Sequence, residues 1–216
     1  MTNFEEIIAF ENTREIVENV TNYGDVKDKI KVRLYNQAKA KDIKGIYKSA
    51  SEYGFDDLII VPIIDFGMTL EGNASMKIPA SLIEIWGVTE DEVYTKGIEN
   101  LDYTIQSMTE IMIDMMRRDG APEEIIEMMM MPSMDVMWVV SNENKLAGAS
   151  GIIKAKAELE ERFPDGYVVL PSSIHEVIVM AKTEDMDKEY MLDMVTEING
   201  GCVAEEDKLA DNVYEF

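Results

Sequence analysis

The sequence predicts an α+β fold, with a mostly antiparallel sheet and several flanking helices in a single domain over residues 1–216. Short apolar runs with strand periodicity occur toward both ends of the chain. Between them, residues 79–131 show helical spacing and helix-start signals, and we expect a helical, Met-rich subregion there. The 216 residues are 46% hydrophobic and contain no internal repeat, which allows a sizeable core and excludes a wholly disordered chain.

The N-terminal third predicts one helix and two strands. Helical spacing of apolar residues predicts a helix over about 3–22, ended by Gly24. Charged and apolar residues alternate over 29–35, which indicates a half-buried strand with a basic outer side. Residues 57–66 are nearly all apolar and predict a strand buried on both faces, where Pro62 favours an edge position or a bulge.

The middle of the chain predicts four helices in succession. Thr89 with Glu92 and Ser107 with Glu110 each have the spacing of a capping box. Pro122 occupies a first-turn position, where its missing N–H costs nothing. The expected helices cover about 79–86, 89–101, 107–120 and 122–131.

The C-terminal third returns mainly to strand periodicity. Apolar runs predict strands over 136–141, 167–170, 174–180 and, at an edge, 212–216. Helices are expected over 154–163 and 187–198, the second ended by Gly200 and Gly201.

The charge balance excludes several classes of function. The formal net charge is −23, so broad binding to nucleic acid or to an anionic membrane is not expected. The single cysteine, Cys202, cannot form an internal disulfide, and the first residues lack a secretory signal. The longest apolar run, 58–64, is far too short to span a bilayer. We therefore expect a cytoplasmic protein.

The charge is also unevenly distributed. Residues 25–48 contain eight basic and three acidic side chains, whereas residues 183–216 contain eleven acidic side chains and two lysines. The acidic segment is either a solvated surface or a surface that attracts a basic partner. The candidate binding carboxylates are Glu184, Asp185, Asp187, Glu189, Glu205, Glu206 and Asp207.

Methionine is the second unusual feature. Ten of the 17 methionines lie between Met108 and Met137. Methionine side chains adapt to different shapes and are frequent at surfaces that accept several partners. The region is either a loosely specified core or homodimer contact, or a groove for another protein, and its candidate binding residues are Met128, Met129, Met130 and Met131.

Catalytic and metal-binding patterns are weak. His175, the only histidine, follows Ser173 by two residues and precedes Glu176, so these three are weak catalytic candidates. The alternative is a structural histidine near the start of a strand. One histidine and one cysteine cannot form a usual zinc site, and no glycine loop has the spacing of a nucleotide-binding motif. We expect no metal and no cofactor.

Several segments in order resemble a known family, and the stretch Leu170–Glu176 within Val169–Ile178 is the most specific of them. The others are Gly87–Tyr94, Trp138–Asn142, Leu146–Ala149 and Val213–Tyr214. Together they resemble a bacterial family described only as a domain of unknown function, found in anaerobic gut bacteria and on mobile elements. The resemblance implies no activity.

The favoured hypothesis is a non-enzymatic protein-binding module. In its sharpest form the acidic surface mimics nucleic acid and blocks the basic groove of a host-defence or nucleic-acid-handling protein. The expected partner is the basic surface of a host factor or a second copy of the chain. The alternatives are a small hydrolase-type enzyme using His175 with Ser173 or Glu176, and a regulatory subunit of a larger assembly.

Overall fold

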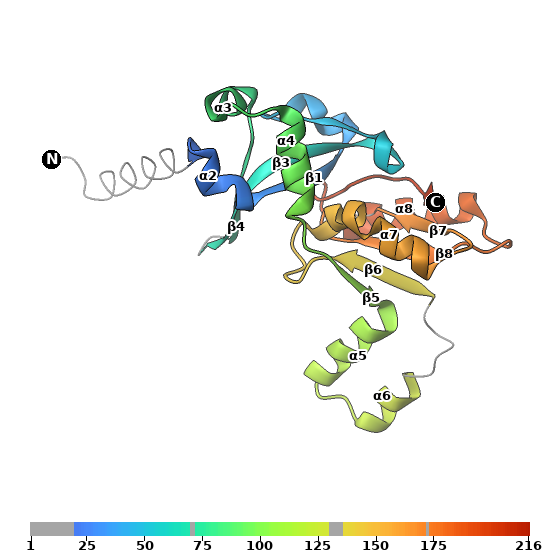
Figure 1. Ribbon diagram of the computed structural model, residues 1–216. Coiled ribbons are helices and arrows are strands. Elements are labelled where there is room, and N and C mark those ends of the chain that lie inside the picture. Colours follow the sequence, from blue (N-terminus) through green and yellow to red (C-terminus); the bar gives the residue numbers. More distant parts are fainter. Residues whose placement is uncertain (1–19, 70–71, 130–135, 172) are drawn as a thin grey trace. The chain divides into compact units, whose positions relative to one another are not determined.

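The computed structural model describes residues 20–69, 72–129, 136–171 and 173–216 (Figure 1). Within these residues the strands form two antiparallel sheets, of four and five strands, with helices beside them, so the predicted α+β class is confirmed. The helix predicted over 3–22 lies almost wholly outside the described residues.

The chain divides into two compact units, which are described separately. The first comprises Met1–Val32, Lys41–Tyr47 and Val61–Asn100, and the second comprises Arg33–Ala40, Lys48–Ile60 and Leu101–Phe216. The single domain expected from the sequence stays a prediction.

The four-stranded sheet is built around one long strand, β3 (Phe55–Thr69). Its neighbours are β1 (Ile30–Asn36) and β2 (Lys48–Ala50) in the order β1-β3-β2, and β4 (Gly72–Lys77) also pairs with β3. Ile30, Val32 and Leu34 of β1 are buried, as the alternating pattern predicts. The strands predicted over 29–35 and 57–66 are confirmed.

Pro62 does not place β3 at an edge, and that prediction is wrong because β3 has neighbours on both sides. The β2 register ends at Ile60 and the β4 register begins at Ile63, so Pro62 falls between them. Its carbonyl accepts the Ile78 N–H, and the Ile78 carbonyl accepts the Ile46 N–H, so the missing N–H of Pro62 does not leave that carbonyl unsatisfied. The alternative, a bulge, does occur farther along β3, between Asp65 and Gly67.

The first unit packs short helices around one apolar cluster. The helices are α2 (Tyr23–Val26), α3 (Ala80–Trp86) and α4 (Glu90–Glu99). Gly87 ends α3 with φ +67°, a left-handed conformation suited to glycine, and α4 begins with the predicted capping box. The buried cluster consists of Val20, Val26, Ile30, Ile64, Ile78, Leu82, Ile83 and Val93.

The second unit contains the five-stranded sheet, in the order β5-β6-β8-β7-β9. The strands are β5 (Thr104–Ser107), β6 (Met137–Ser141), β7 (Tyr167–Leu170), β8 (Val177–Ala181) and β9 (Tyr214–Glu215). Two helices, α7 (Gly151–Arg162) and α8 (Lys188–Cys202), flank this sheet in Figure 1.

Alternating side chains of this sheet meet different helices, as the pleat requires. On one face the Arg162 guanidinium of α7 lies 4.2 Å from the centre of the Trp138 ring. On the other face Val168, Leu170 and Met180 pack against Met191 and Val195 of α8. Because α8 packs over β7 and β8, Met137 of β6 remains 37% exposed on that same face.

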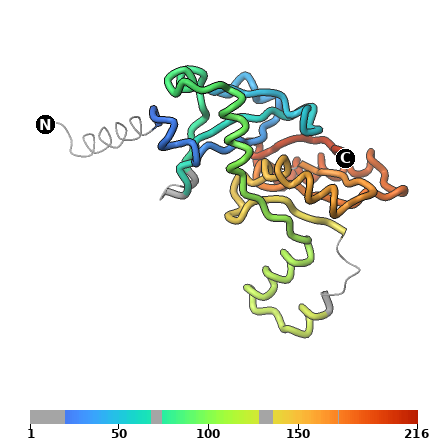
Figure 2. The backbone as a smooth tube through the Cα atoms, viewed as in Figure 1, coloured from blue at the N-terminus to red at the C-terminus, as the bar shows by residue number. Residues whose placement is uncertain are grey.

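A helical hairpin follows β5. Helix α5 (Met108–Arg118) starts with the predicted capping box of Ser107 and Glu110, and α6 (Glu123–Met129) follows Pro122. Figure 2 follows the chain from β5 along α5 and back along α6. Met112 and Met115 are exposed. Met130 and Met131 lie outside the described residues, as do the side chains of Met128 and Met129.

The C-terminal predictions need three corrections. Helix α7 begins at Gly151, earlier than the predicted 154. Helix α8 continues through Gly200 and Gly201, since each exposed helical glycine costs only about 1 kcal/mol and does not force an end. Residues 174–176 are not strand, because the Ile174 N–H donates to the Asp207 carbonyl and the Ile174 carbonyl accepts the Ala149 N–H, and neither partner lies in a strand.

Candidate functional site

His175, the sequence-based catalytic candidate, joins two loops of the second unit. Its carbonyl accepts hydrogen bonds from the Gly148 N–H (3.0 Å) and the Ser141 hydroxyl (2.8 Å). Its ring Nδ1 accepts the Ala147 N–H at 3.1 Å, and its Nε2 lies 3.5 Å from an Asp207 carboxylate oxygen. Because Nδ1 is an acceptor, the proton of the neutral ring resides on Nε2, toward Asp207.

Ser173 and Glu176 do not complete a catalytic arrangement around this ring. The Ser173 hydroxyl accepts the backbone N–H of His175 at 3.0 Å, the bond of a short local turn. Glu176 is exposed. A general base needs a free acceptor nitrogen facing the nucleophile, and here the acceptor nitrogen is bonded to the backbone of Ala147.

The glycine-containing loop before α7 is also occupied by internal bonds. The N–H groups of Gly148 and Ala149 donate to the carbonyls of His175 and Ile174, and the Ser150 hydroxyl accepts the Leu34 N–H. Phosphate-binding loops keep such N–H groups free for the ligand. The local geometry therefore gives no support to a phosphate site in this loop.

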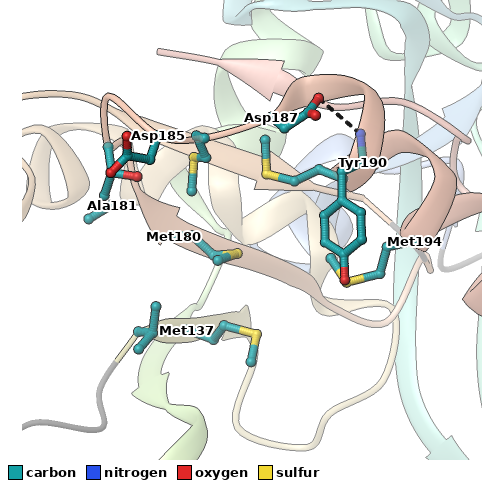
Figure 3. A pocket seen from close by; sticks show the side chains of 11 residues that line it. Met137, Met180, Ala181, Asp185, Asp187, Tyr190 and Met194 are labelled. Atoms are coloured by element: carbon teal, nitrogen blue, oxygen red, sulfur yellow. Dashed lines mark hydrogen bonds between the residues drawn. The ribbon is translucent and has the colours of Figure 1, made fainter.

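A pocket of about 530 Å³ lies in the second unit between β6, β8 and α8 (Figure 3). This volume is within the usual range of ligand pockets. We call it the methionine pocket, because five of its lining residues are Met137, Met180, Met186, Met191 and Met194. Figure 3 shows Met137 and Met180 opposite Tyr190 and Met194 of α8.

The start of α8 sets one wall of this pocket. The Asp187 carboxylate caps the helix by accepting the N–H groups of Glu189 and Tyr190. The helix that begins at this cap contributes Tyr190, Met191 and Met194 to the pocket lining. Asp185 and Asp187 supply its carboxylates, and the remaining lining is mainly apolar.

The carboxylates of this region are not neutralised. Within the part of the chain that the structure describes, the six acidic side chains between 184 and 197 form no ion pair. The nearby Lys182 and Lys188 both contact Glu215, at 2.8 and 3.1 Å. The hydrogen bonds from Lys182 and then Lys188 hold the pKa of Glu215 below its usual value. Both lysines are therefore engaged away from the pocket carboxylates.

Two rows of side chains run along α8, each with members four residues apart and so on one face of the helix. The apolar row is Tyr190, Met194 and Ile198, and Tyr190 and Ile198 are 69% and 43% exposed. The acidic row is Glu189, Asp193 and Glu197, and all three are exposed. Each acid precedes one apolar residue, so the acidic row lies about 100° around the helix axis from the apolar row.

The residues of the other predicted group, 205–207, take part in internal contacts. Glu205 pairs with Lys208 at 2.7 Å, and Asp207 faces His175. The Lys39 ammonium donates to the carbonyls of Glu205 and Glu206. The structure thus separates Glu184, Asp185, Asp187 and Glu189, which adjoin or line the methionine pocket, from the group at 205–207.

The apolar residues that line the pocket were not predicted from the sequence, whereas Asp185 and Asp187 were. Met186, Tyr190, Met194 and Ile198 recur every four residues, and this helical spacing was the available signal. That Met137 and Met180 line the same pocket could not be read from the sequence, because the positions of these two side chains depend on strand register.

Metal-binding and membrane-spanning features are not found in the described ranges. Among those residues no group of three or more His, Cys, Asp or Glu side chains is placed to hold a metal ion. No helix in the same part of the chain is long and apolar enough to cross a bilayer.

Comparison with known proteins gives a family without an assigned activity. The family model described as "Family of unknown function (DUF5688)" matches residues 2–216. No curated protein and no solved structure matches the chain. The resemblance to a family of unknown function is confirmed at that level, and its bacterial and mobile-element setting stays a prediction.

Proposed function

The chain belongs to this family of unknown function, and from its own residues we propose that it is a non-enzymatic protein-binding module for a positively charged protein. The observation that carries the proposal is the set of unpaired carboxylates beside the methionine pocket. An unpaired acidic surface attracts a basic partner and raises its association rate. An uncovered apolar pocket adds the short-range affinity that charge alone does not supply.

A mimic of nucleic acid is the sharper form of this function. A mimic presents carboxylates to a groove that normally holds phosphates, and its affinity depends mainly on charge. The methionine pocket favours a partner that contributes apolar side chains as well. We therefore place the mimic second, and a DNA competitor separates the two.

A hydrolase that uses His175 has weaker support. The ring acceptor nitrogen is bonded to the Ala147 N–H, and the Ser173 hydroxyl is bonded to the backbone of His175. These contacts favour a structural role for the histidine, and we propose that the chain is not an enzyme.

The test is affinity capture from cell lysate at about 50 and about 500 mM NaCl, because pairing of charges weakens steeply over that range. A pocket-charge variant removes five carboxylates near the pocket: Glu184→Gln, Asp185→Asn, Glu189→Gln, Asp193→Asn and Glu197→Gln. A control variant of the same net charge removes five exposed carboxylates elsewhere: Asp56→Asn, Glu84→Gln, Glu143→Gln, Glu161→Gln and Asp165→Asn.

We expect the wild type and the control to retain the same basic proteins at low salt, and the pocket-charge variant to lose them. Release by about 500 mM NaCl is expected too. Capture that is equal for both variants, or insensitive to salt, would contradict the proposal. Release of the partner by added duplex DNA would favour the mimic.

A further inference from the structure

We infer that the methionine pocket and the adjoining face of α8 form a groove for one basic amphipathic helix of the partner. The apolar side of that helix enters the pocket, and its lysines and arginines face the acidic row. This inference rests on the proposed function and adds which part of the partner binds and in what geometry.

The shape of the apolar surface favours a helix over a compact ligand. The apolar row continues from Tyr190 and Met194, which line the pocket, to Ile198, one turn farther along α8. Tyr190 and Ile198 are eight residues apart, or about 12 Å along the helix axis. A small molecule enclosed by the pocket leaves Ile198 uncovered, whereas a helix of three turns covers the whole row.

The charges beside this surface determine what the partner helix carries. Glu189, Asp193 and Glu197 run parallel to the apolar row at the same four-residue spacing. At the pocket, Asp185 and Asp187 add two more carboxylates. A helix that places its apolar and basic residues in two adjacent rows matches both rows at once, because equivalent positions recur every three to four residues.

The methionines make the groove tolerant of sequence. Five thioether side chains line it, and each has three rotatable bonds with which to fit apolar groups of different shape. We therefore expect recognition of the helical pattern and the positive charge, with little preference among leucine, isoleucine, phenylalanine and tryptophan.

Other segments of the chain itself are poor candidates for this groove. Residues 1–19 contain five glutamates and one arginine, and residues 130–135 contain no lysine or arginine. Their charge has the same sign as the acidic row, so they are repelled by it. A separate basic protein is the occupant that the charges favour.

The test uses three fluorescein-labelled synthetic peptides of 18 residues, titrated with the full chain and followed by anisotropy. The first contains lysine and leucine in a helical pattern with one apolar face. The second has the same composition in an order that gives no apolar face, and the third replaces every lysine of the first by glutamate. Tyr190→Ala and Met194→Ala remove contacts from the groove, and Ile85→Ala is the control because Ile85 is 61% exposed on α3.

We expect the first peptide to bind at least tenfold more tightly than the second, and the third to show no binding. Tyr190→Ala and Met194→Ala weaken the first peptide about tenfold, as anchoring residues do, and change the second little. Ile85→Ala has no effect. Unchanged thermal unfolding of each variant shows that the loss belongs to the groove.

The failures of the two proposals are distinguishable. Equal affinity for the first and second peptides, with no effect of the groove variants, overturns the groove and leaves a basic partner held by charge. Absence of binding to both lysine peptides at about 50 mM NaCl overturns the basic partner itself. A dimer of the free chain that Tyr190→Ala dissociates overturns the inference by assigning this face to a second copy.

Discussion

Two regions of the second unit differ in whether their polar groups are bonded within the chain: the methionine pocket, and the cluster formed by His175 with Ser141, Ala147, Gly148 and Asp207, which we call the His175 cluster. Around His175 the ring nitrogens, the backbone carbonyl and the neighbouring amides face partners within the chain. At the pocket the carboxylates form no ion pair within the described residues, and Met137 and Tyr190 remain exposed.

This difference shows that residue type alone does not tell which polar groups are bonded within the fold. A histidine two residues from a serine is a weak sign of catalysis, and here the histidine faces Asp207 and the backbone of Ala147. Methionines and acids are ordinary residues, yet here they leave apolar surface and charge available together. Groups that are unsatisfied within the fold are the ones that can bind another molecule.

The largest effect is expected at Gly148, within the His175 cluster. A Cβ at this position lies 2.5 Å from the Asn142 nitrogen and 2.7 Å from the Ser141 hydroxyl, so Gly148→Ala forces the loop apart. We expect a loss of about 3 kcal/mol in the free energy of unfolding, measured by urea denaturation.

The matched substitution is Gly200→Ala on α8, where nothing lies within 4 Å of the added Cβ. There alanine has the better helix propensity and stabilises by about 1 kcal/mol. Equal effects of the two substitutions would show that the loop before α7 is less tightly bonded than the structure indicates.

His175→Ala is expected to have the next largest effect. It removes the acceptor of the Ala147 N–H and the neighbour of Asp207, at a cost of about 2 kcal/mol in unfolding free energy. Binding of the amphipathic lysine–leucine peptide should not change, because the methionine pocket is lined by other residues. Both are measured on the same samples, by urea denaturation and by anisotropy.

His175→Asn is the informative control, because its side-chain oxygen can accept in place of Nδ1 and restore part of the lost stability. A variant that keeps full stability but loses peptide binding would contradict the assignment of His175 to the fold.

The same contrast explains how much the sequence could predict. Capping boxes at Thr89 and Ser107 and the apolar alternation of β1 are local signals, and those elements were predicted close to their observed bounds. Strands β2 and β4 are rich in polar and small residues and exist because β3 provides a partner. Pairing of this kind depends on distant residues, so local periodicity does not reveal it.

The candidate site was predicted in part for the same reason. Asp185, Asp187 and Glu189 stand out in the sequence by their charge density. Met137 and Met180 face the pocket only because β6 and β8 pair in one particular register. That Glu205 and Asp207 contact Lys208 and His175 is a further consequence of tertiary folding.

The smallest expected effect concerns Glu215, which holds Lys182 and Lys188. These lysines lower the folded-state pKa of Glu215, so its contribution to stability is present above the unfolded pKa near 4.5 and is lost as the pH falls through the folded value. Because the pair is more than one-third exposed, Glu215→Gln should cost less than about 1 kcal/mol at pH 7. The difference from the wild type should shrink as the pH falls below about 4.5 and disappear once it is below the folded-state pKa of Glu215.

Glu215→Gln also tests a second point. It asks whether Asp185 and Asp187 are free to bind a basic peptide because Glu215 holds Lys182 and Lys188 away from them. Once released, Lys182 and Lys188 can screen Asp185 and Asp187, and the amphipathic peptide should bind about two- to fivefold more weakly. Glu205→Gln is the matched control, since it also removes one charge and frees one lysine, Lys208, from a pair outside the pocket lining. If Glu205→Gln weakens the peptide as much as Glu215→Gln does, total charge governs binding and the local arrangement around α8 does not.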